Sequence, residues 1–399
     1  MRKVILSAML LLFILSCGLF ATLFSSNSND SSSGSVLASE VVGDCWTTMA
    51  PMNCARGNLG VVAVDGMIYA IGGRLANPGG LSESNYVSTT ERYDPKSNTW
   101  TTLASMPTPR YDFATVVCDG KIYCIGGYGY NDGREFPLEM QITLGVMEAY
   151  NIAADSWSPK ASLPLSRGTL QTYTMDGKIF ALDKASRHYL FVYDPVADSW
   201  TTQSDLMNSL GHDLSSAFVD DKLFVTGNFY SKTEHGAPER KVMTYTPKTD
   251  TWREGKIGPA IATFTSATGV TTGSYAPQRV YVFCDTGATL VYNPKTAAWD
   301  FVAARPTSRG SFGVAVVDDV SYVIGGFTDT GSISLAVNEQ YVPVDYGTLS
   351  PELGVSLDMV LVVVLTVTIA VVVMVVLLLF FFKNKGKQAK NNLAIASIW

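Results

Sequence analysis

The amino-acid sequence predicts an all-β fold built from repeated four-stranded units, and two observations carry this prediction. The first is a block that opens with Tyr and closes with Trp seven residues later, found five times between residues 93 and 299. The second is a pair of short apolar runs around Asp-Gly or Asp-Asp, as in "VVAVDGMIYAIGG" from residue 61. Such a pair indicates a tight β-hairpin, and the Pro, Asn or Asp inside each Tyr–Trp block marks another turn.

The Tyr–Trp block keeps its register along the chain. Its copies are "YDPKSNTW" ending at 100, "YNIAADSW" at 157, "YDPVADSW" at 200, "YTPKTDTW" at 252 and "YNPKTAAW" at 299. Successive Trp residues lie 43 to 57 residues apart, a period typical of repeat architectures. Each unit therefore consists of one hairpin followed by a second hairpin.

This pattern resembles the kelch repeat, in which a Gly-Gly pair closes the second strand and precedes the Tyr and the Trp. Three units match it fully, through Gly72-Gly73, Gly126-Gly127 and Gly325-Gly326. The units around "FALDK" from 180, "FVTGN" from 224 and "VFCDT" from 282 keep the apolar strand but lose one or both glycines. The resemblance covers residues 45 to 345 and implies a β-propeller in which each unit forms one blade.

The predicted propeller has six four-stranded blades. Second strands end near residues 73, 127, 183, 227, 285 and 326. The last unit, "NEQYVPVD", has no Trp of its own, whereas "DCWTTMAP" at 44 to 51 has no Tyr before it. We expect this N-terminal strand to complete the sixth blade, because closure removes an unpaired sheet edge. We expect the aromatic residues of the repeat to pack the blades: Tyr93, Tyr150, Tyr193, Tyr245, Tyr292, Tyr341, Trp46, Trp100, Trp157, Trp200, Trp252 and Trp299.

The segments that flank the propeller, expected at 43–345, indicate a membrane protein. Residues 359–382 carry no charge and are followed by lysines, which predicts a transmembrane helix and a short cytoplasmic tail at 383–399. Residues 1–24 form a signal peptide or a signal anchor, residues 25–42 a Ser-rich linker, and residues 346–358 a second linker. The propeller is therefore expected outside the cytoplasm, at the cell membrane.

A candidate binding site follows from the positions of four arginines. Arg56, Arg110, Arg167 and Arg309 each stand nine residues before a hairpin Asp-Gly or Asp-Asp, and His212 stands beside the equivalent position in blade four. These side chains are expected at the pore mouth, with Tyr111 nearby, on the face that carries the long loops between second and third strands. Residues 43–358 contain 23 Lys and Arg against 33 Asp and Glu, so a cationic ring there would select anionic groups. The alternative is that the arginines hydrogen-bond neighbouring loops.

The function that we expect is binding of a protein or an anionic surface glycan through the long-loop face. The alternative is an enzyme that acts on sugars, because some six-bladed kelch propellers are sialic-acid mutarotases; a third is a structural envelope component. The sequence favours a binding module. The three histidines have no metal-ligand spacing, and no catalytic residue, metal, cofactor or nucleic-acid partner is predicted. Whether Cys45 pairs with Cys54 is left open.

Overall fold

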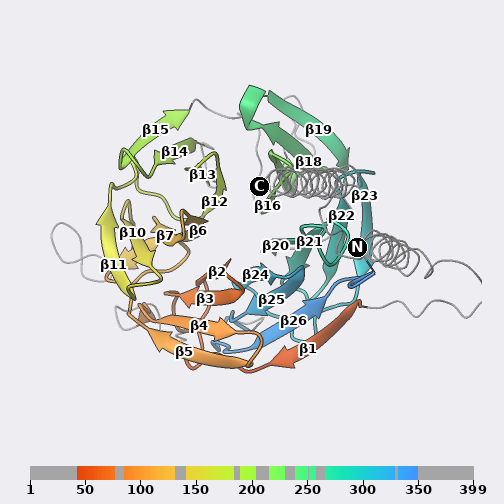
Figure 1. Cartoon of the computed structure of the whole chain (residues 1–399), viewed down its shortest axis with the longest axis horizontal. Coiled ribbons are helices and arrows are strands. Elements are labelled where there is room, and N and C mark those ends of the chain that lie inside the picture. The colour runs from red at the N-terminus through yellow and green to blue at the C-terminus, as the bar shows by residue number, and fades with distance from the viewer. Residues whose placement is uncertain are drawn as a thin grey trace, which may run out of the picture. The chain divides into compact units, whose positions relative to one another are not determined.

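The computed structural model describes residues 43–76, 85–130, 141–183, 189–203, 215–229, 239–249, 251–257, 266–328 and 331–348. Within these residues, six antiparallel four-stranded sheets are arranged as blades around a central axis (Figure 1). The prediction of an all-β, six-bladed propeller is confirmed. We number the blades in chain order and their strands from the axis outward.

The first three blades follow one another along the chain. Blade 1 contains β2 (Gly60–Val64), β3 (Met67–Ile71), β4 (Thr90–Asp94) and β5 (Thr99–Leu103). Blade 2 contains β6 (Ala114–Cys118), β7 (Lys121–Ile125), β10 (Met147–Asn151) and β11 (Ser156–Lys160), with a small sheet of β8 (Tyr128–Tyr130) and β9 (Gln141–Thr143) between its second and third strands. Blade 3 contains β12 (Leu170–Met175), β13 (Lys178–Asp183), β14 (Leu190–Asp194) and β15 (Ser199–Gln203).

The second half of the ring has the same order. Blade 4 contains β16 (Ser215–Val219), β17 (Lys222–Phe229), β18 (Glu239–Thr246) and β19 (Thr251–Ile257), with a short 3-10 helix at Pro247–Thr249. Blade 5 contains β20 (Ser266–Val270), β21 (Val280–Cys284), β22 (Thr289–Asn293) and β23 (Ala298–Val302). Blade 6 contains β24 (Gly313–Val317), β25 (Val320–Ile324), β26 (Asn338–Val342) and β1 (Cys45–Met49).

Blade 6 confirms the predicted closure by the N-terminal strand. Strand β1 pairs antiparallel with β26, from Cys45 opposite Val342 to Met49 opposite Asn338. Figure 1 shows β1 on the outer edge of that blade, next to β26. The first and last strands of the propeller therefore share one sheet, and the ring has no open blade.

The repeat aromatics pack in the same way in every blade. The Tyr of the third strand faces the Trp of the fourth, as Tyr150 faces Trp157 in blade 2. All six Tyr–Trp pairs have ring centroids 4.9 to 5.0 Å apart. Since each block keeps Tyr and Trp seven residues apart, the turn between them brings the two rings into direct opposition.

The Asp-Gly turns and the Gly-Gly pairs adopt backbone conformations that explain their residue types. In the turn between β6 and β7, Asp119 and Gly120 have φ of 49° and 67°, as a type I′ hairpin requires. At the end of β7, Gly126 and Gly127 have φ of 65° and 100°, in the left-handed region that favours glycine. Each Gly-Gly pair therefore lets the chain turn sharply out of the second strand.

The predicted segments that flank the propeller are the signal segment, two linkers, the apolar run and the tail. The signal segment 1–24, the Ser-rich linker 25–42, the apolar run 359–382 and the tail 383–399 lie outside the described residues. In the part of the chain that the structure describes, no helix is long and apolar enough to span a membrane.

Candidate functional site

Three of the predicted arginines do not line an open pore mouth. They are Arg56, Arg110 and Arg309, which stand shortly before the first strands of blades 1, 2 and 6 and which we call the entry arginines. Each has no exposed surface, although the sequence predicts an accessible ring. Each guanidinium forms a buried ion pair with a Glu on the third strand of the same blade: Arg56 with Glu91, Arg110 with Glu148, and Arg309 with Glu339. The expectation of an exposed ring is therefore corrected for these three side chains, and a ligand role for them stays a prediction.

The Arg–Glu pairs join the blade entry to the second and third strands. In blade 6, Arg309 Nη2 donates to the carbonyl of Val323 on β25 at 2.8 Å, and Glu339 on β26 accepts a 2.6 Å hydrogen bond from Thr307 Oγ1. Arg110 repeats this arrangement in blade 2 through Cys124 and Thr108. Buried charges with this many partners hold the strands of a blade together. The geometry therefore favours a structural role for these arginines over a ligand-binding role.

The remaining predicted site residues have different surroundings. Arg167 keeps a quarter of its side chain exposed, and its Nε donates to Asp183 Oδ2 at 2.7 Å. Blade 3 carries Phe191 at the position where blades 1, 2 and 6 carry the buried Glu, which explains why Arg167 is not drawn into the blade. Tyr111 is buried, and His212 lies outside the described residues.

A stack of side chains on the long-loop face was not predicted from the sequence. Its centre is Arg74, whose guanidinium carbon lies 4.4 Å from the ring centroid of Phe327 and 5.4 Å from that of Tyr111. Tyr111 in turn stacks on Tyr86 at 5.5 Å and on Tyr128 at 5.6 Å. We call these five residues the Arg74 stack; they come from blades 6, 1 and 2.

The repeat itself positions the stack. Arg74, Tyr128 and Phe327 each follow a Gly-Gly pair, and each pairs through its backbone with the residue after an entry arginine. Glycine after Arg56 and after Arg167 leaves room for the rings: a Cβ on Gly57 would lie 2.3 Å from the Phe327 ring, and one on Gly168 only 2.1 Å from the Tyr128 ring. The signal was therefore present in the sequence, in the residue that follows each Gly-Gly pair.

Arg74 differs from the buried arginines in its electrostatic environment. It is partly exposed, and among the described residues its guanidinium forms no ion pair and no hydrogen bond. Beside it, burial raises the pKa of Tyr111 to about 12, so the Tyr111 hydroxyl stays neutral at physiological pH. A cation that lies beside aromatic rings and has no carboxylate partner among the described residues can receive an anionic group.

Comparison with known proteins finds the same repeat in part of the chain. The model of the Kelch motif matches residues 55–107 and 109–164, which include blades 1 and 2. Together with the six Tyr–Trp blades, this match decides the assignment. The chain is a kelch-repeat β-propeller.

Relatives of this kelch propeller share part of its length. Kelch-like protein 35 of Mus musculus is 26% identical over 227 residues, which cover 57% of this chain and 35% of the relative. Kelch-like protein terF of Aspergillus terreus is 28% identical over 218 residues, which cover 52% of this chain and 46% of the relative. The aligned region thus spans less than half the length of these relatives.

The fold also matches a solved structure. The structure of YjhT superposes with a TM-score of 0.57 at 13% identity, covering 72% of this chain and 95% of YjhT. At this level of identity the likeness concerns the fold alone.

The thiols and metal-binding residues of the kelch propeller add no second site. Cys45 and Cys54 are both free thiols, so they do not form a disulfide with each other in this structure. Cys118, Cys124 and Cys284 are free and buried. Among the described residues no group of three His, Cys, Asp or Glu side chains is placed to hold a metal, and His188, His212 and His235 lie outside them.

Proposed function

We propose that this kelch propeller is a protein-interaction module that binds a partner through its long-loop face, with Arg74 as the anchor. The observation that carries the proposal is the contrast between Arg74 and the entry arginines. Arg56, Arg110 and Arg309 are neutralised by buried carboxylates, whereas Arg74 is partly exposed between two aromatic rings. Arginine and tyrosine are the residues that most often dominate binding energy at protein interfaces.

The partner that fits this stack carries a carboxylate. A guanidinium carries its N–H donors in one plane, and a carboxylate can accept two of them. The surrounding domain is acidic, with 33 Asp and Glu against 23 Lys and Arg over residues 43–358. An acidic segment would therefore be repelled over most of the surface and attracted at Arg74, which gives specificity.

Panning a phage-displayed random-peptide library against the purified full chain tests this proposal. We expect the selected peptides to be enriched in Asp and Glu, and Arg74→Ala to weaken their binding by about 2 kcal/mol, roughly thirtyfold. Tyr275→Ala is the matched control, because Tyr275 is exposed on the opposite face, between β20 and β21. Peptides that bind Arg74→Ala unchanged would exclude the proposal.

The same assay separates a glycan from a protein ligand. Free sialic acid is added as a competitor for the selected peptides. Displacement of the peptides by the sugar would favour the anionic-glycan alternative, and turnover of the sugar would favour the mutarotase-like alternative. No displacement is expected for a face that binds an acidic peptide.

We further propose that the propeller is tethered at the cell membrane, outside the cytoplasm, by residues 359–382. The support is the 24-residue uncharged run followed by Lys383, Lys385, Lys387 and Lys390. Protease added to intact cells should cut the loop at 231–241. Protection of that loop in intact cells, with cutting only after lysis, would contradict the extracytoplasmic placement.

A further inference from the structure

Most described blade interfaces are joined at the outer rim by the same pair of hydrogen bonds, which we call the clasp. Between blades 1 and 2, the backbone N–H of Ala104 donates to Asp155 Oδ1 at 2.8 Å, and Trp157 Nε1 donates to the carbonyl of Ala104 at 2.9 Å. The hydroxyl of Tyr150 donates to the same Asp155 oxygen and holds it in place. One residue at the end of an outer strand is thus bound on both sides by the next blade.

Three further interfaces carry the clasp with equivalent residues. They are Ala50 with Asn98 and Trp100, Ala161 with Asp198 and Trp200, and Ala303 with Asp44 and Trp46. The closing blade is therefore clasped on both sides, to blade 5 through Trp46 and to blade 1 through Ala50. The blade that closes the ring is therefore hydrogen-bonded to both of its neighbours.

Within the part of the chain that the structure describes, the interface between blades 4 and 5 lacks the clasp. Position 297, two residues before Trp299, is Ala and has no side-chain acceptor. Its φ is 53°, the same left-handed conformation that Asp or Asn adopts in the clasped blades. The indole Nε1 of Trp299 is buried and has no hydrogen-bond partner within the described structure. In blade 4 the equivalent acceptor, residue 250, lies outside the described residues, and Trp252 Nε1 is also buried without a partner among them. The interface between blades 4 and 5 differs in that Ala297 also removes the acceptor.

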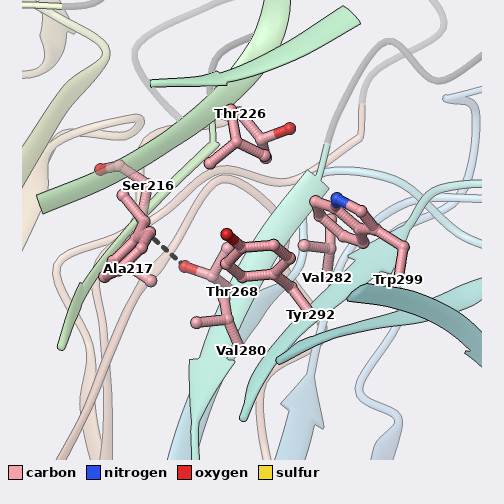
Figure 2. Close-up of a pocket in the computed structure, with 10 residues that line it drawn as sticks. Ser216, Ala217, Thr226, Thr268, Val280, Val282, Tyr292 and Trp299 are labelled. Atoms are coloured by element: carbon pink, nitrogen blue, oxygen red, sulfur yellow. Dashed lines mark hydrogen bonds between the residues drawn. The ribbon is translucent and has the colours of Figure 1, made fainter. Parts of the chain in front are cut away.

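The described core at the same interface contains few buried residues. The described core cluster between blades 4 and 5 contains five buried residues, whereas the one between blades 2 and 3 contains thirteen. A pocket with room for about one water molecule opens beside Ala217, Phe224, Tyr292 and Trp299. Figure 2 shows Ala217 of blade 4 across this pocket from Tyr292 and Trp299 of blade 5. Among the described residues, apolar contacts therefore do not replace the missing hydrogen bonds.

We propose that the interface between blades 4 and 5 is the seam at which the propeller opens first. Local opening starts where the fewest buried contacts and hydrogen bonds must be broken. By that criterion the opening point is this unclasped seam. It is not the closing blade, although that blade is assembled from the two ends of the propeller.

Thiol labelling of two matched variants of the full chain tests the proposal. Ala217→Cys and Ala315→Cys place a thiol at equivalent inner-strand positions, both 6% exposed, one at the seam and one between blades 6 and 1. Labelling is followed peptide by peptide by mass spectrometry, with the buried native thiols as internal references. The loss of two hydrogen bonds predicts that Ala217→Cys reacts roughly ten- to thirtyfold faster. Equal rates, or faster labelling of Ala315→Cys, would overturn the proposal.

A second pair of variants tests the cause of the opening. Ala297→Asn restores an acceptor and suits the left-handed backbone, whereas Ala297→Gly relieves the backbone alone. We expect Ala297→Asn to slow labelling of the Ala217→Cys thiol more than Ala297→Gly does. Equal effects of the two substitutions would show that the missing clasp is not the reason for the opening.

Discussion

Trp46 and Tyr341 face each other across β1 and β26, with ring centroids 5.0 Å apart. The hydroxyl of Tyr341 also donates to Asp44 at 2.9 Å, and Trp46 Nε1 donates to Ala303 of blade 5 at 2.9 Å. The N-terminal strand is therefore fixed to two blades at once. This relationship closes the linear set of repeats into a ring.

The buried Arg–Glu pairs predict a large loss of stability when one partner is removed. Glu148→Ala leaves the Arg110 guanidinium buried without its carboxylate, which should lower the free energy of unfolding by about 3–5 kcal/mol. The double variant Arg110→Met with Glu148→Leu should recover most of this loss, because it removes both charges and keeps apolar volume. Denaturant unfolding measures both effects.

A surface pair provides the control for this prediction. Lys178 Nζ and Asp194 Oδ2 are 3.3 Å apart, and the two side chains are 50% and 34% exposed, so Lys178→Met should change the free energy of unfolding little. If Glu148→Ala proves as mild as Lys178→Met, the Arg110–Glu148 pair is not a structural element and the ligand-binding ring regains support.

Replacement of glycine by alanine should lower stability more in a Gly-Gly pair than in a hairpin turn. A Cβ on Gly127 would lie 2.8 Å from the carbonyl oxygen of Tyr111, whereas one on Gly120 would meet nothing within 4 Å. Both have positive φ, so Gly120→Ala should cost about 1 kcal/mol from the backbone alone. Gly127→Ala should lower the midpoint of thermal unfolding clearly further, and equal midpoints would refute the close-approach explanation.

We expect the loop that Asp319 binds, at residues 274–276, to lose stability in acid. Its carboxylate accepts hydrogen bonds from the backbone N–H groups of Ser274, Tyr275 and Ala276 at 2.9, 2.7 and 3.0 Å. Burial raises the pKa of Asp319, but these bonds and those of Thr272 outweigh burial and hold the pKa below its ordinary value of 3.8. The folded state therefore binds fewer protons than the unfolded state near that pH.

The stabilisation by Asp319 is thus present above the ordinary pKa and is lost as the pH falls through the lower, folded pKa. Asp319→Asn should cost about 2–3 kcal/mol near neutral pH and make the remaining stability less dependent on acid. Unfolding curves of the wild type and Asp319→Asn across the acidic range measure this difference. Parallel curves, with a constant gap down to the lowest pH, would contradict it.

The fold was predictable because the same local pattern occurs in several units of the chain. Each Tyr–Trp block and each Asp-Gly turn indicates a local hairpin. Trp46 has no Tyr in its block and Tyr341 has no Trp, which indicated that these two residues belong to the same blade. These signals lie within hairpins, where the distance along the chain is short and the register is set by the turn. Repetition therefore made a six-bladed ring inferable from local patterns.

The site was less predictable because its contacts cross between distant strands. Arg110 was placed correctly at the start of an inner strand, but its partner Glu148 lies 38 residues away and faces it only once the blade has formed. A signal existed in the sequence: Glu stands two residues before the Tyr only in the three blades with complete Gly-Gly pairs. The Arg74 stack was missed because its members come from three different blades.

The measurement that tests the ring most directly is complementation of a truncated chain. Deleting residues 43–50 removes β1, its Trp46 and the Asp44 that binds Tyr341, so the thermal midpoint should fall strongly. A synthetic peptide of residues 43–50 should restore the midpoint when added in trans, and the same peptide carrying Trp46→Ala should not. A truncated chain that unfolds at the wild-type temperature without any peptide would contradict closure of the propeller by its N-terminal strand.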